Sequence, residues 1–141
     1  TVGLVPILKM FTLGHDFMPP SIHAGGLRYH GDSPLVCKLV RDNYIRAVAY
    51  HQTEVLKSAV LFGKTEGHII APESSHALHC AIQEALKCKE TGEEKTIVFN
   101  NSGHGNFDLA AYEAYFNGSL MDYEYPEDLI NQSLKKLPMR N

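Results

Sequence analysis

Thr96-Ile97-Val98-Phe99-Asn100-Asn101-Ser102-Gly103-His104-Gly105 is the most informative stretch of this sequence. Its first four residues are mainly β-branched or aromatic, so they predict a strand. The loop 100–105 follows at once, and apolar spacing predicts a helix over about 108–116. Open α/β sheets bind ligands at such loops, beyond the carboxyl ends of their strands. The stretch therefore predicts an α/β fold and, at the loop, a site.

Strand and helix also alternate upstream of this stretch. Short β-rich runs predict strands over 45–50 and 68–70, and helical spacing of apolar residues predicts helices over 33–43, 53–63 and 72–92. Such alternation predicts an α/β sheet.

Three parts are expected along the chain. Residues 1–32 are glycine-rich and irregular, residues 33–118 form the α/β domain, and residues 119–141 form an acidic, proline-containing tail. Irregular segments as long as the first are usually functional, or they pack on elements elsewhere in the protein.

Composition favours a small-molecule partner. The net charge is −3, with acidic and basic residues interspersed, so neither nucleic acid nor an anionic membrane is an expected partner. The three cysteines lack CxxC spacing, which predicts free thiols in a reducing cytoplasm. The apolar opening is too short and proline-interrupted for a membrane span.

Two loops carry candidate functional groups. Glu73 follows Pro72 at a predicted helix start, where it either supports the positive helix end or shares a crevice with Ser102 and orients a ligand. The Gly103-x-Gly105 pattern is either a tight turn or part of a ligand loop. The eight histidines lack zinc-site spacing, so a zinc site is not expected.

Several strings occur in an order that is specific when taken together. They are Leu8-Lys9-Met10, Leu13-Gly14-His15-Asp16, Ile22-His23-Ala24-Gly25-Gly26-Leu27-Arg28-Tyr29-His30-Gly31, Thr65-Glu66-Gly67, Ala71-Pro72-Glu73-Ser74-Ser75-His76-Ala77 and Ser102-Gly103-His104-Gly105. Over about residues 8–118 the chain resembles the C-terminal portion of the tryptophan synthase beta family, type 2. The string around Arg28 resembles the second type, since the first type has an aspartate at that position.

The resemblance implies a fold-type-II pyridoxal-phosphate enzyme, in which a three-layer αβα domain with a parallel sheet packs against another domain and the cofactor lies between them. Ser102 would hydrogen-bond the pyridine nitrogen, and Gly103 and the backbone at Gly26 would also contact the cofactor. Glu73 would face the cofactor and the incoming indole. Carbonyls of Tyr29 and Gly31 would fall where the first type of beta chain binds a monovalent cation.

The implied reaction is a β-replacement that joins L-serine, or O-phosphoserine, to indole and yields L-tryptophan. Arg28 favours phosphoserine because a guanidinium binds an anionic leaving group. A homodimer is implied, and association with an alpha subunit is left open. Two alternatives remain: a non-catalytic α/β ligand-binding or interaction domain, and another fold-type-II lyase, such as a serine dehydratase.

Two departures from the family pattern limit the resemblance. Asn101 stands where an apolar residue is usual. Nothing in the chain resembles the lysine that forms a Schiff base with the cofactor, or the glycine-rich phosphate loop, both of which lie upstream in this family. By itself the chain is therefore expected to be inactive.

Overall fold

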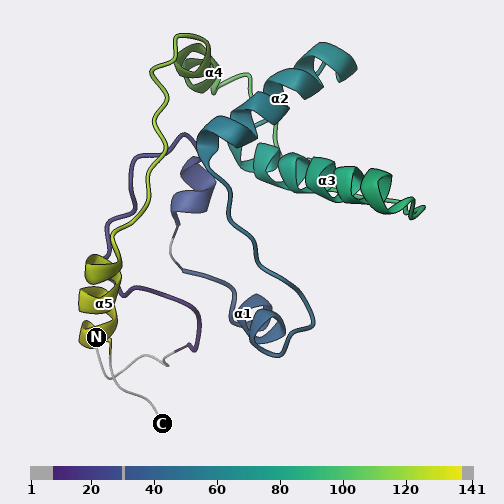
Figure 1. The fold of residues 1–141 in the computed structure, drawn as a ribbon. Helices are drawn as coiled ribbons and strands as arrows, with labels where there is room; N and C mark the ends of the chain where they lie inside the picture. The colour runs from purple at the N-terminus through teal and green to yellow at the C-terminus, as the bar shows by residue number, and fades with distance from the viewer. Residues whose placement is uncertain (1–7, 30, 138–141) are drawn as a thin grey trace. The chain divides into compact units, whose positions relative to one another are not determined.

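The computed structural model describes residues 8–29 and 31–137, and these form helices joined by extended segments (Figure 1). In chain order the elements are the 3-10 helix η1 (Gly25–Arg28) and the α-helices α1 (Pro34–Arg41), α2 (Gln52–Glu66), α3 (Pro72–Thr91), α4 (Leu109–Phe116) and α5 (Glu127–Lys136). None of these helices is long and apolar enough to cross a membrane.

The chain divides into two compact units. The first contains Thr1–Pro20, Arg28–Ala49 and Glu124–Asn141, and the second contains Ser21–Leu27 and Tyr50–Tyr123. Helices α1 and α5 therefore belong to the first unit, and α2, α3 and α4 belong to the second. The predicted division into 1–32, 33–118 and 119–141 stays a prediction.

The predicted helices are confirmed, and local chemistry explains their ends. Pro34 and Pro72 open α1 and α3, where a residue without a backbone N–H is tolerated. Gly92 ends α3 with a φ of 70°, a left-handed conformation that glycine adopts without strain. Helix α2 runs past its predicted end at Gly63 because Gly67, with a φ of 72°, is the residue that stops it.

The predicted parallel sheet is not confirmed. Residues 45–50 and 96–99 are not assigned to strands, and the described chain contains only one isolated antiparallel bridge outside named strands, between Ile70 and His104. A strand requires neighbouring backbone that pairs with its N–H and C=O groups. Val98 of the best predicted strand is 87% exposed, whereas Phe99 beside it is partly buried against the core, so this segment is covered on one side only.

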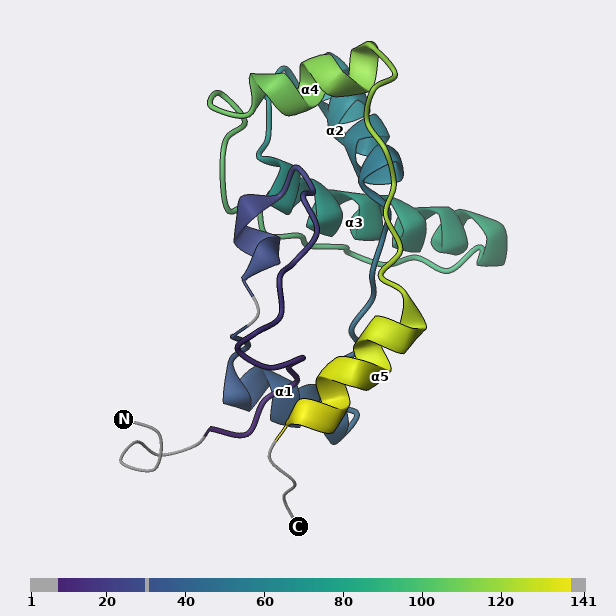
Figure 2. The ribbon, with the colours of Figure 1, turned by 90° about the vertical axis from the view of Figure 1, so that its left-hand side faces the viewer.

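The core of the second unit lies where α2 packs against α3 and α4 (Figure 1; Figure 2). Its buried residues are Leu56, Ala59, Ile70, Leu78, Ala111 and Tyr112. A buried hydrogen bond of 2.8 Å between Ser58 Oγ and His79 Nδ1 joins α2 to α3. The Tyr112 hydroxyl donates to the carbonyl of Ile70 at 2.6 Å and holds the segment between α2 and α3 in place.

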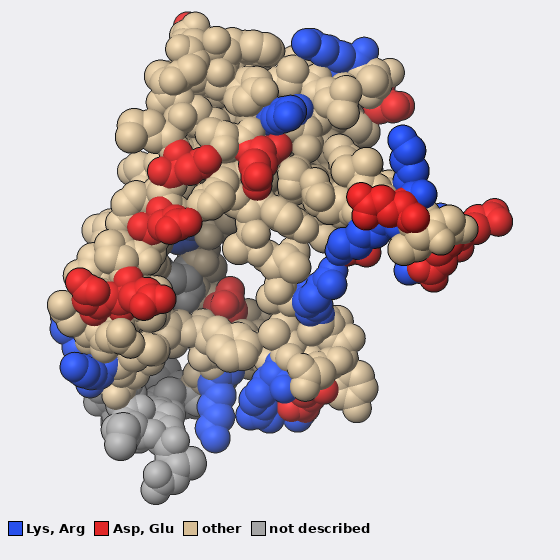
Figure 3. All heavy atoms as spheres, in the orientation of Figure 1, with Lys and Arg blue, Asp and Glu red and all other residues tan. Residues whose placement is uncertain are grey.

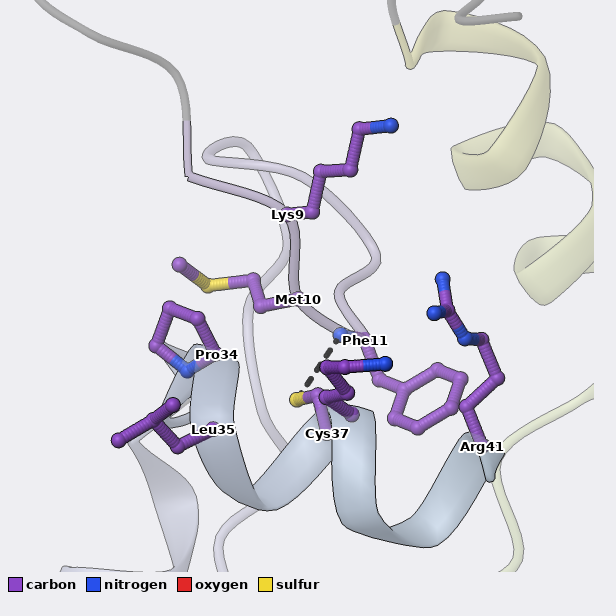
Figure 4. A pocket seen from close by; sticks show the side chains of 8 residues that line it. Lys9, Met10, Phe11, Pro34, Leu35, Cys37 and Arg41 are labelled. Carbon is purple, nitrogen blue, oxygen red and sulfur yellow. Dashed lines mark hydrogen bonds between the residues drawn. The ribbon is translucent and has the colours of Figure 1, made fainter.

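The first unit contains a hollow of about 500 Å³ beside α1 (Figure 4). Its lining combines apolar side chains with Lys9, Lys38 and Arg41. The backbone N–H of Phe11 donates to the Cys37 sulfur at 3.3 Å and ties the preceding segment to the helix. On the face of the molecule seen in Figure 3, acidic and basic side chains are interspersed.

Candidate functional site

The loop 102–105 is fastened along the residues that lead into α3. The N–H of Ala71 donates to the carbonyl of Gly103 at 2.9 Å, and the N–H of Gly105 donates to the carbonyl of Ile69 at 2.8 Å. A Cβ atom added to Gly105 would lie 2.4 Å from the carbonyl oxygen of Ile70. Only glycine allows this approach, so Gly105 lets the loop pack against the residues that precede α3.

Ser74 connects this loop to the first turn of α3. Its hydroxyl lies 3.0 Å from the Ser102 hydroxyl and accepts a hydrogen bond of 3.0 Å from the N–H of Gly103. Ser74 is 2% exposed, whereas Ser102 is exposed. The residues around Ser74 carry no sequence signal for this contact, because a serine in a first helical turn usually serves its own helix.

Glu73 anchors a second loop at the same turn of α3. Its Oε1 atom accepts a hydrogen bond of 2.8 Å from the N–H of Gly26. A Cβ atom added to Gly26 would lie 3.3 Å from the Glu73 Cγ atom, so a glycine permits this close contact. The other carboxylate oxygen of Glu73 has no hydrogen-bond partner among the described residues. Glu73 therefore does more than support its helix end.

Helix α2 holds the same glycine segment from its other side. The Gln52 side chain accepts a hydrogen bond of 3.1 Å from the N–H of His23, and Ala24 beside it is 3% exposed. The segment 23–26 is thus fixed by residues of α2 and α3.

Burial shifts the pKa values of two ionisable groups near the first turn of α3. The pKa of His76 is lowered because burial disfavours its charged form, and the Glu73 carboxylate opposes this shift only in part. Burial raises the pKa of Tyr112, while a hydrogen bond with Ser75 acts in the opposite direction. Tyr112 therefore remains a neutral donor at physiological pH.

The structure brings four of the predicted site residues to one helical turn. Glu73 and Gly26 meet directly, and Ser102 and Gly103 both contact Ser74, the residue after Glu73. The first turn of α3 thus carries a carboxylate oxygen, and the loop that is hydrogen-bonded to it carries an exposed hydroxyl. Their roles in binding and catalysis stay predictions.

The remaining predicted residues belong to the first unit. The Nε atom of Arg28 is buried and has no hydrogen-bond partner in the described chain. The Tyr29 side chain is 76% exposed, and a Cβ atom added to Gly31 would lie 2.8 Å from its hydroxyl oxygen. The substrate role of Arg28 and the cation site at the carbonyls of Tyr29 and Gly31 stay predictions.

No residues of the described chain form a group of three or more His, Cys, Asp or Glu side chains arranged to hold a metal ion. The Glu73 carboxylate, the Ser102 hydroxyl and the glycine backbone are groups of the kind that hold a small organic ligand through hydrogen bonds.

Comparison of the sequence with known proteins shows which family the chain resembles. The chain is 67% identical to tryptophan synthase beta chain 2 of Aquifex aeolicus over 122 residues, which are 86% of this chain and 28% of that protein. It is 60% identical to the protein of the same name from Methanosarcina acetivorans over 86% of this chain and 27% of that protein. Tryptophan synthase beta chain of Pyrococcus horikoshii is 50% identical over 98% of this chain and 30% of that protein. No family model matches the chain.

The chain belongs to the tryptophan synthase beta family, type 2, and the resemblance seen in the sequence is thereby confirmed. It spans less than a third of the length of the relatives that it matches.

Proposed function

We propose that the full-length protein is a pyridoxal-phosphate-dependent tryptophan synthase beta subunit that joins L-serine, or O-phosphoserine, to indole. The observation that carries this proposal is the 67% identity to a protein of that name. The site is compatible with it, because the first turn of α3 carries a carboxylate and anchors the loop that carries an exposed hydroxyl. Pyridoxal phosphate, when bound, supplies the electron sink for the reaction.

The donor groups of the chain fit this cofactor. Ser102 would donate to the pyridine nitrogen, and because a serine hydroxyl is a very weak acid, the nitrogen would stay unprotonated. The backbone at Gly26 and Gly103 would line the cofactor without side-chain obstruction. The Glu73 oxygen that has no hydrogen-bond partner among the described residues would face the cofactor and the indole and exchange a proton there.

The relatives favour this reaction over the alternatives. Their names specify tryptophan synthase rather than a serine dehydratase or a ligand-binding domain. By itself, the chain is proposed to be inactive, because no lysine in it has the family context of the Schiff-base residue.

The extended segments of the chain are proposed to complete a sheet. Residues 45–50, 68–70 and 96–99 would become strands of a parallel αβα sheet when the rest of the protein supplies neighbouring strands. The exposure of Val98, at 87%, supports this proposal, because an apolar strand residue is stable only when covered.

Further properties follow from the family resemblance. We propose a homodimer in the reducing cytoplasm, which suits the free thiols of Cys37, Cys80 and Cys88. The carbonyls of Tyr29 and Gly31 would bind a monovalent cation.

Ser102 tests the cofactor proposal. In the full-length protein, Ser102→Asp is expected to protonate the pyridine nitrogen, shift the absorbance of the bound cofactor and change the balance of products, because a carboxylate stabilises the protonated ring. Ser102→Ala is expected to do less. Asn101→Asp adds the same charge one residue away and is the matched control. Unchanged spectra and products in Ser102→Asp would refute contact with the ring.

Arg28 tests the choice of substrate. Its Nε atom is buried and, within residues 8–29 and 31–137, has no hydrogen-bond partner, so it could donate to an anion. In the full-length protein, Arg28→Ala is expected to lower kcat/KM for O-phosphoserine more than for serine, by about 1–2 kcal/mol. Arg41→Ala, which removes an exposed arginine paired with Asp42, is the control. Equal losses with both substrates would assign Arg28 a structural role.

A further inference from the structure

We propose that Ser74 is a positioning residue that sets the direction of the Ser102 hydroxyl. Ser74 accepts from the backbone N–H of Gly103 and donates to Ser102 Oγ, so the Ser102 proton is left for an acceptor atom of the ligand. The inference rests on the proposed function, since the acceptor in question is an unprotonated ring nitrogen.

Burial decides how the Ser74 hydroxyl is used. Ser74 is 2% exposed, so its hydroxyl cannot donate to bulk water and needs an acceptor within the protein. Its oxygen lies 3.0 Å from two atoms: the backbone nitrogen of Gly103, which can only donate, and the Ser102 oxygen. The acceptor left for the Ser74 proton among these partners is therefore Ser102 Oγ.

The opposite direction would leave a buried proton unpaired. If Ser102 donated to Ser74, the Ser74 oxygen would accept twice and its own proton would have no partner in either contact. An unsatisfied buried donor is more costly than a hydrogen bond is favourable. Ser102 is exposed and has no such constraint, so its proton is the one that remains available.

Neighbouring Ser75 shows that the arrangement at Ser74 is specific. Ser75 is 0% exposed and donates its hydroxyl to the carbonyl of Ala71, within its own helix, at 2.9 Å. Ser74 instead makes both of its contacts across 28 or 29 residues of sequence. The two adjacent serines are thus equally buried, but only Ser74 acts on the loop 102–105.

This series of hydrogen bonds leaves the Ser102 hydroxyl as a donor to an acceptor atom of the ligand. It runs from the Gly103 N–H through Ser74 to Ser102, and each bond polarises the next. Such a chain favours a neutral heteroaromatic nitrogen with a free lone pair over a protonated one, which would compete as a donor.

A double-mutant cycle in the full-length protein tests the inference. The dissociation constant for pyridoxal phosphate is measured by absorbance titration of the cofactor-free protein in wild type, Ser74→Ala, Ser102→Ala and the double variant. Ser74→Ala is expected to weaken binding about five- to tenfold in the wild-type background and less than about twofold in the Ser102→Ala background, because it acts through Ser102. Ser75→Ala is the matched control and is expected to change binding less than about twofold.

A second measurement needs no cofactor. Hydrogen exchange at the amide of Gly103 is expected to accelerate in Ser74→Ala, which removes its acceptor, and to stay unchanged in Ser102→Ala and Ser75→Ala. This readout also shows whether the variants keep their fold.

The outcomes separate two kinds of failure. If Ser102→Ala itself leaves cofactor binding unchanged, the proposed function of the site fails. If Ser102→Ala weakens cofactor binding but Ser74→Ala has no more effect than Ser75→Ala, the positioning role of Ser74 fails and the proposed function stands. The same conclusion follows if Ser74→Ala weakens cofactor binding equally in the wild-type and Ser102→Ala backgrounds.

Discussion

Gly105→Ala in the full-length protein is expected to lower the free energy of unfolding by about 3 kcal/mol. The added Cβ atom would lie 2.4 Å from the carbonyl oxygen of Ile70 and 2.9 Å from the Ile69 side chain. Neither backbone can move easily, because the Gly105 N–H donates to Ile69 and the Tyr112 hydroxyl holds the Ile70 carbonyl. Thermal unfolding measures the loss, and hydrogen exchange over 69–71 and 102–105 locates it.

Gly63→Ala is the matched control for this prediction. Gly63 lies in α2, and its added Cβ atom would meet only the carbonyl oxygen of His68, at an ordinary contact distance of 3.5 Å. Because alanine favours a helix interior, this variant is expected to stabilise the protein by about 0.5–1 kcal/mol. Equal effects of the two substitutions would mean that the loop 102–105 is not closely packed against residues 69–71.

Replacing Glu73 is expected to have the largest effect on activity. Both Glu73→Ala and Glu73→Gln are expected to lower turnover in the full-length protein about 100-fold or more, since each removes the carboxylate proposed to exchange a proton. They differ in structure, because the glutamine amide oxygen can still accept from the Gly26 N–H, whereas alanine cannot. Steady-state kinetics measures the loss, and hydrogen exchange of residues 24–27 measures the anchoring.

Exchange over this segment is expected to accelerate in Glu73→Ala and to stay near wild type in Glu73→Gln. Glu90→Ala, an exposed position near the end of the same helix, serves as the control. Turnover within about threefold of wild type in both Glu73 variants would leave Glu73 only as the anchor of the glycine loop.

The sequence was sufficient to predict features of the fold whose physical cause lies within a few residues. The ends of α1 and α3 follow from Pro34, Pro72 and Gly92, because a missing N–H or a left-handed conformation acts within a few residues. The family strings likewise identified the chain, since identity in sequence is what its relatives share.

The extended segments show that a local sequence pattern is not enough to predict a strand. Residues 96–99 have strong strand propensity, yet they form no strand, because a strand also depends on a partner that its own sequence does not supply. Glycine end signals were ambiguous for a similar reason. Gly63 resembled a helix stop, but a glycine with room around it is compatible with a continuing helix.

The sequence by itself determined the helices, the family and the residue types of the candidate site. Only the tertiary structure placed Glu73 against Gly26, 47 residues away, and Ser74 against Ser102, 28 residues away. A serine or glutamate in a first helical turn carries no local sign of a distant partner. Core packing brings two loops to the same turn of a helix, and the buried donors and acceptors there must then form hydrogen bonds with one another.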